Sequence, residues 1–185
     1  NENWCSDKPV SEWYGVICGE SFIWALQLGN NNLKGEIPNE IGNLSNIQSL
    51  ELDNNQISGM VPKEMRKLNK LHSLNLSYTD ISGPFFEGIE GLCDLESLQL
   101  IGCPNITSIS ENIKYLQKLS MLRVSGSISK RINCSLPSTI GECKALREIE
   151  FAWANAENEI PRSIGALSNL TYLNLYNANY KGSIP

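Results

Sequence analysis

The sequence predicts an α/β solenoid, a fold in which short structural repeats stack in the order of the chain. The first reason is an apolar frame, apolar-x-x-apolar-x-apolar, that recurs seven times along the 185 residues. Its first positions are Ile23, Ile47, Leu71, Leu95, Leu119, Leu146 and Leu170. The spacing is 24 residues except for one interval of 27. Self-similarity at a fixed period of this length is the signature of a repeat architecture.

Asparagine is the second reason. The chain has 21 Asn residues against 23 Leu residues. An Asn that recurs once per repeat is able to bond the backbone of its own turn and of the next one. The position three residues beyond each frame is occupied by Asn31, Asn55, Thr79, Cys103, Ser127, Ala154 and Ala178. We expect a ladder of side-chain hydrogen bonds in the first two frames, with Asn155 and Asn179 replacing it in the last two through a shifted turn.

Each frame predicts a short strand followed by a helical turn. The last two apolar residues, such as Leu50 and Leu52, have the period of two of a strand with one buried face. A Gly-x-Ile-Pro signature follows, as at residues 35–38 and 182–185. Its Pro opens a helical turn, where the missing N–H is tolerated. An Ile-Gly-x-Leu segment then returns the chain to the core, as at residues 41–44.

The complete frame, Leu-x-x-Leu-x-Leu-x-x-Asn-x-Leu-x-Gly-x-Ile-Pro, resembles the plant-type leucine-rich repeat. The segment that contains Trp4, Cys5 and Trp13–Cys18 resembles the N-terminal cap of that family, Trp-x-Gly-Val-x-Cys. The resemblance implies a right-handed curved superhelix with a parallel concave sheet and helical or 3-10 turns on the convex side. It also implies a cysteine cap at residues 1–22 and about seven repeats at residues 23–185. Family members include ectodomains of receptor kinases, receptor-like proteins and secreted polygalacturonase inhibitors.

The sequence departs from the repeat pattern in two places. The fifth repeat carries three extra residues within residues 125–133, and the last repeat stops at Pro185 without a polar cap. Tyr172, Leu173, Leu175 and Tyr180 would then lie on an open edge, and repeat arrays need their ends covered. We therefore expect further repeats, a cap or a second chain to cover this edge. The chain alone should self-associate through it.

The secretory pathway is predicted by six Cys residues together with five Asn-x-Ser/Thr sequons. The sequons begin at Asn43, Asn75, Asn105, Asn133 and Asn169. We expect Asn43 and Asn169, beside the convex-side return, to be reachable by the glycosylation machinery, whereas occupancy of Asn133, which precedes Cys134, stays open. A glycan on Asn75 would project over the concave face. An extracellular or cell-surface location follows from these features.

Cysteine pairing is predicted only in the cap, where Cys5 and Cys18 flank the segment that resembles the family's N-terminal motif. Cys143 occupies a position filled by Leu in other repeats, which is typical of a buried thiol used as a small apolar residue. The connectivity of Cys93, Cys103, Cys134 and Cys143 stays open. One alternative joins Cys103 to Cys134 in the adjacent repeat.

Catalysis, cofactors, metals and nucleic acids are not indicated by the sequence. The net charge is −5, whereas nucleic-acid binders normally carry a basic face. The only histidine, His72, is expected on a solvated strand flank, and the basic cluster at residues 63–70 on a solvated convex turn. Glu148 and Glu150 would lie about 6.5–7 Å apart on one strand, which overlaps the spacing of inverting glycosidases. They occupy variable outward positions of a repeat strand, so we expect no enzymatic activity.

The outward positions of the last three strands form the predicted binding surface. Repeat proteins use their concave faces for binding, and exposed Trp, Tyr and Arg side chains dominate interface energies. The candidate ligand-binding residues are Arg123, Glu148, Glu150, Trp153, Tyr172, Asn174 and Tyr176. Trp153 has the alternative of packing on the next turn. We expect the ligand to be a peptide, a protein or a cell-wall glycan.

Two other functions are compatible with the same sequence. The chain could stack end to end as the structural subunit of an extracellular filament or matrix. It could also be a secreted inhibitor of a cell-wall hydrolase. No membrane-spanning segment is expected in this sequence, since no apolar run approaches the required ~18 residues.

Overall fold

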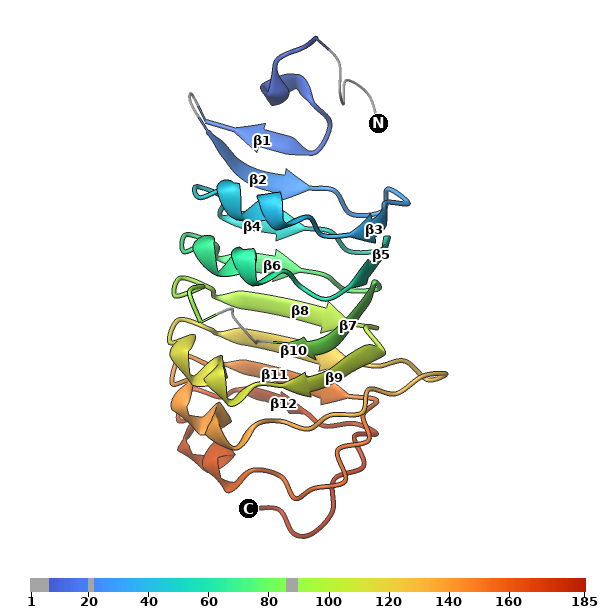
Figure 1. Ribbon diagram of the computed structural model, residues 1–185. Coiled ribbons are helices and arrows are strands. Elements are labelled where there is room, and N and C mark those ends of the chain that lie inside the picture. Colours follow the sequence, from blue (N-terminus) through green and yellow to red (C-terminus); the bar gives the residue numbers. More distant parts are fainter. Residues whose placement is uncertain (1–6, 20–21, 86–89) are drawn as a thin grey trace.

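The computed structural model describes residues 7–19, 22–85 and 90–185 of the chain. They form an elongated solenoid whose repeats stack along one axis, with the chain running from one end to the other (Figure 1). The predicted fold class is confirmed. No helix in these described residues is both long enough and apolar enough to cross a membrane.

The main sheet has eight strands and runs through every repeat. The strands in spatial order are β1 (Val16–Cys18), β2 (Ile23–Gln27), β4 (Ser49–Glu51), β6 (Ser73–Asn75), β8 (Ser97–Ile101), β10 (Met121–Ser125), β11 (Glu148–Ala152) and β12 (Tyr172–Asn174). All pair in parallel except β1, which is antiparallel to β2. Equivalent residues of successive frames face each other, as Leu98 faces Leu122 and Leu122 faces Ile149. The extra residues of the fifth repeat therefore lie outside this sheet.

A second sheet, which the sequence analysis did not predict, lies on the far side of the first four repeats. Its strands are β3 (Lys34–Glu36), β5 (Gln56–Gly59), β7 (Asp80–Phe85) and β9 (Asn105–Ile109), in that order. Lys34 pairs with Gln56, 22 residues away, whereas strands of the main sheet pair mostly at 24. β3, β5 and β7 contain Gly, and none of the four segments has a regular alternation of apolar residues, so their sequence pattern does not predict a strand.

Six short 3-10 helices are found in the described residues. They are η1 (Val10–Glu12), η2 (Asn39–Asn43), η3 (Lys63–Lys67), η4 (Glu111–Tyr115), η5 (Ser138–Glu142) and η6 (Arg162–Ala166). As predicted, a Pro immediately precedes η2, η3, η5 and η6. At η4 this position is held by Ser110, whose hydroxyl accepts a hydrogen bond from the N–H of Asn112. That oxygen satisfies a first-turn donor, which Pro cannot do.

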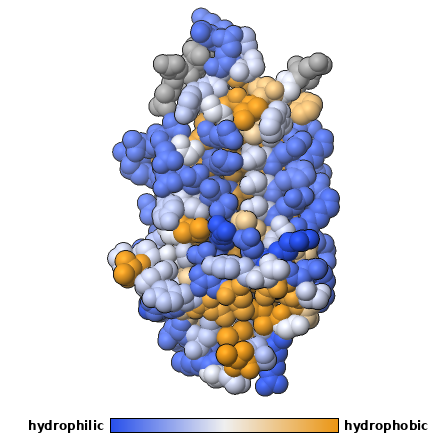
Figure 2. All heavy atoms as spheres, turned by 180° about the vertical axis from the view of Figure 1, so that it is seen from behind, coloured by the Kyte–Doolittle hydropathy of each residue, from blue (hydrophilic) through white to orange (hydrophobic). Residues whose placement is uncertain are grey.

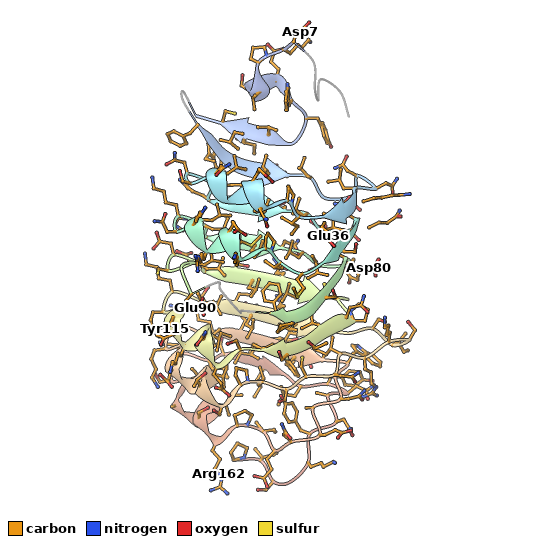
Figure 3. The ribbon with its side chains drawn as sticks, viewed as in Figure 1. Asp7, Glu36, Asp80, Glu90, Tyr115 and Arg162 are labelled. Atoms are coloured by element: carbon orange, nitrogen blue, oxygen red, sulfur yellow. The ribbon has the colours of Figure 1, made fainter. Side chains whose placement is uncertain are left out.

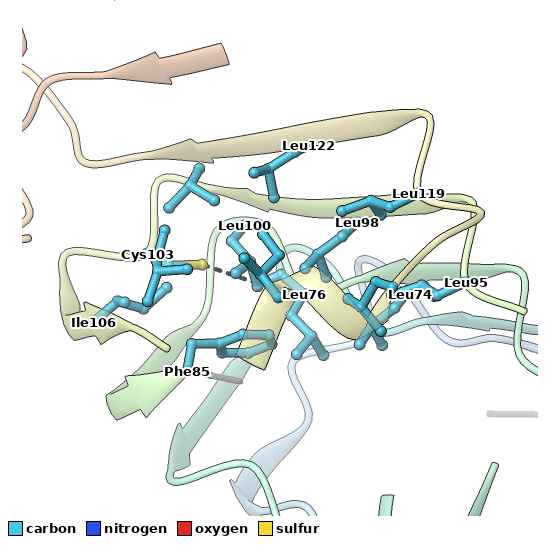
Figure 4. Packing of buried hydrophobic residues seen from close by; sticks show 14 of the residues in the cluster. Leu74, Leu76, Phe85, Leu95, Leu98, Leu100, Cys103, Ile106, Leu119 and Leu122 are labelled. Atoms are coloured by element: carbon cyan, nitrogen blue, oxygen red, sulfur yellow. Dashed lines mark hydrogen bonds between the residues drawn. The ribbon is translucent and has the colours of Figure 1, made fainter. Parts of the chain in front are cut away.

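The core consists of the frame residues stacked between the two sides of the solenoid. Leu74, Leu98 and Leu122 come from successive strands and are completely buried (Figure 4). Each such leucine contributes about 1.5–3 kcal/mol by leaving water. Cys143 is also completely buried at its Leu position, as predicted, and its thiol donates to the carbonyl of Ile113 at 3.2 Å.

Asn55 joins the first two repeats through its buried side chain. Its Nδ2 donates to the carbonyls of Leu28 (2.9 Å) and Leu52 (2.8 Å). Its Oδ1 accepts from the backbone N–H groups of Asn31 (3.1 Å) and Leu33 (2.9 Å). One amide group thus satisfies backbone groups on both sides of a repeat boundary, as the ladder requires.

Thr79 and Cys103 occupy the same inward position in the next two repeats, where they form fewer hydrogen bonds to the backbone than Asn55 does. The hydroxyl of Thr79 donates to the Leu76 carbonyl at 2.6 Å, and the thiol of Cys103 donates to the same oxygen at 3.1 Å (Figure 4). Each side chain has a single donor hydrogen, which it gives to this carbonyl, whereas the amide of Asn55 has two donor hydrogens and a separate acceptor oxygen.

The predicted replacement by Asn155 and Asn179 is wrong. Ala154 and Ala178 are buried in the inward position, whereas Asn179 is exposed. Asn155 is half-buried, and its Nδ2 donates to Oδ1 of Asn133 at the surface. A small methyl group, rather than a shifted Asn, fills the interior of the last two repeats.

The insertion of the fifth repeat leaves the stack as a loop. Gly126 precedes it and is surrounded by backbone, because a Cβ there would lie 2.6 Å from the carbonyl oxygens of Lys130 and Trp153. Ser127 belongs to this loop and bonds Lys130 instead of entering the ladder. The chain rejoins the stack at Ile132, which pairs with Ala154.

The cysteine predictions have different outcomes. Cys5 lies outside the described residues, so its bridge to Cys18 stays a prediction. Cys18 is half-buried and has no disulfide partner in the described part of the chain. Cys103 and Cys134 are both buried free thiols, so the alternative pairing between them is wrong. The division of the chain at residues 22 and 23 also stays a prediction.

Replacing Asn55 with Ala should destabilise the fold by about 2–3 kcal/mol, because buried backbone donors and acceptors would lose their partners. Asn31→Ala is the matched control, since Nδ2 of Asn31 donates only to the carbonyl of Gly29 two residues earlier. We expect its effect to be less than half as large. Urea unfolding followed by circular dichroism measures both changes, and equal losses would contradict the role of Asn55.

The buried thiols should be unreactive in the folded protein. Burial raises the pKa of Cys134 and of Cys143 from 9.0 to about 12. Iodoacetamide at pH 8 should therefore modify the exposed Cys93 and leave Cys134 and Cys143 unmodified until the chain unfolds. Peptide mass spectrometry identifies the labelled sites. Rapid labelling of Cys143 without unfolding would contradict its position in the core.

These two thiols also predict a pH dependence of stability. Their folded pKa lies above the unfolded value, so the folded state holds its protons more tightly. Their contribution to the free energy of unfolding should be complete below about pH 9 and should decrease as the pH rises toward 12. Melting temperatures of the wild type and of Cys143→Ala, measured from pH 7 to pH 11, test this. The variant should show the shallower decrease.

Candidate ligand-binding face

The last three strands of the main sheet bring the predicted ligand-binding residues together. Arg123 of β10 is opposite Glu150 of β11, and Glu150 is in turn opposite Asn174 of β12. Glu148 is opposite Tyr172 in the same way. Figure 2 shows the solenoid from the side opposite Figure 1, and hydrophobic residues gather toward its C-terminal end. We call Arg123, Glu148, Glu150, Trp153, Tyr172, Asn174 and Tyr176 the concave patch.

Arg123 provides the charge at one side of the concave patch. Its Nη2 donates to Oε2 of Glu148 at 3.0 Å, and both side chains are about one-third exposed. Its Nε is buried and has no hydrogen-bond partner among the described residues. An unpaired buried donor costs about 1–3 kcal/mol, and a ligand reaches only the exposed third of this side chain.

Two aromatic rings form the other side. Trp153 and Tyr176 pack edge to face with their ring centroids 5.4 Å apart. Trp153 is half-buried, and its backbone lies in the left-handed region with a φ of +51°. The equivalent residues Asn30, Asn54, Tyr78, Gly102 and Asn177 also have a positive φ, so this conformation belongs to the turn that the repeats share. Tyr176 remains 64% exposed and Tyr172 46% exposed, so both rings are available to a ligand.

The two remaining members of the patch have different roles. Glu150 is half-buried at the centre of β11, between the strands that carry Arg123 and Asn174. Oδ1 of Asn174 accepts from the N–H of Tyr176 at 2.9 Å, which fixes the turn that carries this ring. Glu148 is held in an ion pair with Arg123, so the two glutamates do not form an isolated carboxylate pair.

Arg131 supports the patch, and the sequence analysis did not identify it. It comes from the insertion, and its guanidinium donates to the carbonyls of Ala154 (3.2 Å) and Asn177 (2.8 Å) and to Oδ1 of Asn177. Asn177 follows Tyr176 directly. The insertion therefore anchors the turn that presents Tyr176, across 46 residues of sequence. The three-residue departure from the repeat period was the available signal.

Tyr180 lies outside the concave patch. Its ring packs against Phe151 at a centroid distance of 6.2 Å, and its hydroxyl oxygen accepts from the N–H of Leu136 at 3.0 Å. Burial raises the pKa of Tyr180 to about 12. It is therefore a packing residue between the fifth and seventh repeats rather than part of the predicted open edge. Leu173 on that edge is 43% exposed.

Other predicted positions lie away from the patch. Asn43, Asn133 and Asn169 are exposed, whereas Asn75 and Asn105 are half-buried. His72 is half-buried and its Nδ1 is a buried atom without a partner in the described residues, so the prediction of a solvated flank is wrong. The basic cluster is exposed on and after η3, as predicted. No group of three metal-ligating side chains is found in the part of the chain that the structure describes.

Comparisons with known proteins agree with the solenoid fold. A family model described as leucine rich repeat matches residues 25–81. A probable leucine-rich repeat receptor-like protein kinase of Arabidopsis thaliana is 37% identical over 51 residues, which are 26% of this chain and 5% of that protein. The chain thus spans a small part of the length of this curated relative.

Two solved structures are similar over most of the chain. The ectodomain of the Arabidopsis receptor kinase HAESA, in complex with an N-terminally extended IDA peptide hormone, has a TM-score of 0.83 and 26% identity. The match covers 94% of this chain and 29% of that one. The plant peptide hormone receptor RGFR1, in complex with RGF2, has a TM-score of 0.70 and 28% identity, covering 89% and 29%. The fold of the chain is a leucine-rich repeat solenoid, similar to the ectodomains of plant receptor kinases.

Proposed function

We propose that this chain is an extracellular recognition module that binds a peptide through the concave patch and performs no chemistry on it. The observation that carries the proposal is the juxtaposition of the partly exposed Arg123 guanidinium with the edge-to-face pair of Trp153 and Tyr176, on and just beyond three neighbouring strands. Arg, Trp and Tyr are the residue types that contribute most to binding energy at protein interfaces.

The first element of recognition is Arg123. Its Nη2 is already bonded to Glu148, which orients the guanidinium, while its Nε has no partner among the described residues. A peptide supplies carbonyl or carboxylate oxygens as acceptors. Such an oxygen would accept from the exposed part of the guanidinium, and a charge-assisted bond of this kind contributes about 1.5–3 kcal/mol.

The second element is the aromatic pair. Tyr176 presents its exposed ring while the half-buried Trp153 supports it from the edge. The bonds from Arg131 to Asn177 fix the adjacent backbone before a ligand arrives. Preorganisation of this type reduces the entropic cost of binding. Rings of this kind suit apolar or proline-rich portions of a peptide.

The similar structures support a peptide as the ligand. HAESA and RGFR1 were each solved with a peptide hormone, at 26% and 28% identity to this chain. Both are receptor proteins of plants, which supports an extracellular location and glycosylation at the exposed sequons Asn43 and Asn169. A protein or glycan ligand, stacking into a filament, and inhibition of a cell-wall hydrolase stay predictions from the sequence, without a structural observation that favours them.

A selection with phage-displayed random peptides against the purified chain tests the proposal. For the enriched peptides, Tyr176→Ala should weaken binding by about tenfold or more, since it removes an exposed ring of the patch. Tyr115→Ala is the matched control. Tyr115 is 52% exposed and lies on η4, on the helical side of the solenoid (Figure 3). Calorimetry measures both affinities, and equal effects of the two substitutions would contradict the proposal.

The role of the guanidinium is tested with Arg123→Lys. Lysine keeps the positive charge beside Glu148 but has no planar fork of N–H donors. We expect affinity for the same peptides to decrease by about tenfold while the melting temperature stays within a few degrees of the wild type. Unchanged affinity would show that the Arg123 side chain acts only through its charge.

A further inference from the structure

A second surface, away from the concave patch, lies where the second sheet ends. β9 is the last strand of that sheet in the described chain, and the segment 133–137 that follows it in the next repeat forms no strand. No backbone hydrogen bond joins residues 105–109 to residues 133–137 among the described residues. The outer edge of β9 therefore keeps backbone groups that β3, β5 and β7 use for pairing.

Contacts from the later repeats explain why the sheet stops here. Ile132 pairs with Ala154 rather than with β9. The N–H of Leu136 donates to the hydroxyl oxygen of Tyr180, two repeats further along the chain. The segment that would have continued the sheet is thus held by the sixth and seventh repeats. Figure 1 shows irregular chain beyond β9, where the earlier repeats have strands.

A groove of about 770 Å³ opens at this interruption. It is lined by residues 107–109 of β9, by residues 133–138 and by residues from 155–161. One end is fixed by Glu111, whose carboxylate accepts from the N–H groups of Ser138 (3.0 Å) and Thr139 (2.9 Å). The unpaired edge of β9 thus lies in a groove, and the bonds from Ser138 and Thr139 to Glu111 hold the repeats on its two sides together.

The groove is acidic. Glu111, Glu157 and Glu159 contribute to its lining, and no Lys or Arg is among the lining residues. Glu157 and Glu159 are exposed, and neither forms an ion pair with another described residue. Burial alone would raise the pKa of Glu111, but hydrogen bonds from Ser138 and Thr139 hold that pKa below its ordinary value. The surface therefore favours a cationic occupant.

We infer that this groove binds an extended, basic polypeptide segment, which adds a strand to the open edge of β9 and pairs its Lys or Arg side chains with Glu157 and Glu159. Strand addition supplies affinity through main-chain hydrogen bonds and selectivity through alternate side chains. β9 has five residues, so the paired part of the ligand spans about 16 Å at ~3.3 Å per residue. This site is independent of the concave patch and of its ligand.

Asn133 provides a condition for this inference. It is exposed, lines the groove and begins a sequon, so a glycan on it would fill the space that the peptide needs. The inference therefore requires Asn133 to be unmodified in the natural protein. Glycopeptide mass spectrometry of the secreted protein should find this site bare, and a fully occupied Asn133 would overturn the inference.

The binding experiment uses a fluorescent heptapeptide of alternating lysine and valine, capped at both ends so that no terminal charge contributes. Its affinity for the chain is measured by fluorescence anisotropy at physiological salt. Two comparison peptides have the same length: one replaces lysine with glutamate, and one carries N-methyl groups on alternate backbone nitrogens. The lysine peptide should bind at least about tenfold more tightly than either, because only it has both the charge and the free strand donors.

Charge reversal locates the site. The double substitution Glu157→Lys with Glu159→Lys should weaken the lysine peptide by about tenfold or more. Glu36→Lys with Glu40→Lys makes the same change of charge at exposed positions of the first repeat and should leave the affinity unchanged (Figure 3). Equal losses in both double variants would indicate a general electrostatic effect and overturn the site. Equal binding of the N-methylated peptide would overturn strand addition.

Discussion

Burial of leucine side chains between neighbouring repeats is the interaction on which the rest of this structure depends. Frame residues of the central repeats, such as Leu74 and Leu98, are completely buried because the repeats before and after them cover their two sides. A single repeat would expose the same side chains and would not be stable alone. The parallel register follows from this packing, because it places equivalent leucines opposite one another. The outward residues then face solvent in aligned rows.

The alignment of outward residues turns the repeat into a recognition surface. Once Leu122 and Ile149 are in register, Arg123 and Glu150 must be neighbours on the solvent side. The chain places small polar residues there in its early repeats and Arg, Glu and Tyr in its later ones. The surface therefore changes character along the axis while the core beneath it stays constant. Arg131 then adds what the periodic part cannot provide, a contact that fixes an irregular turn.

The second sheet and the groove beside it arise from a competition between repeats. In the first four repeats the segment after each turn pairs with its predecessor, as Lys34 does with Gln56. In the fifth, the insertion and the side chain of Tyr180 direct the chain toward the following repeats instead. The same residues that stabilise the C-terminal half thus leave the edge of β9 open. The contacts that stabilise the C-terminal repeats are therefore also the reason why the edge of β9 is unpaired.

The sequence by itself determined the solenoid, the strands of its main sheet, its buried leucines and the row of residues that forms the concave patch. It could do so because a period of 24 residues and an alternation of two are local properties, readable without knowing any distant contact. Only the tertiary structure decided that Ala154 rather than Asn155 fills the interior, that Tyr180 turns inward, and that the second sheet ends at β9. These outcomes depend on contacts between residues 22 to 46 positions apart, such as that from Arg131 to Asn177, which form only after the repeats have stacked.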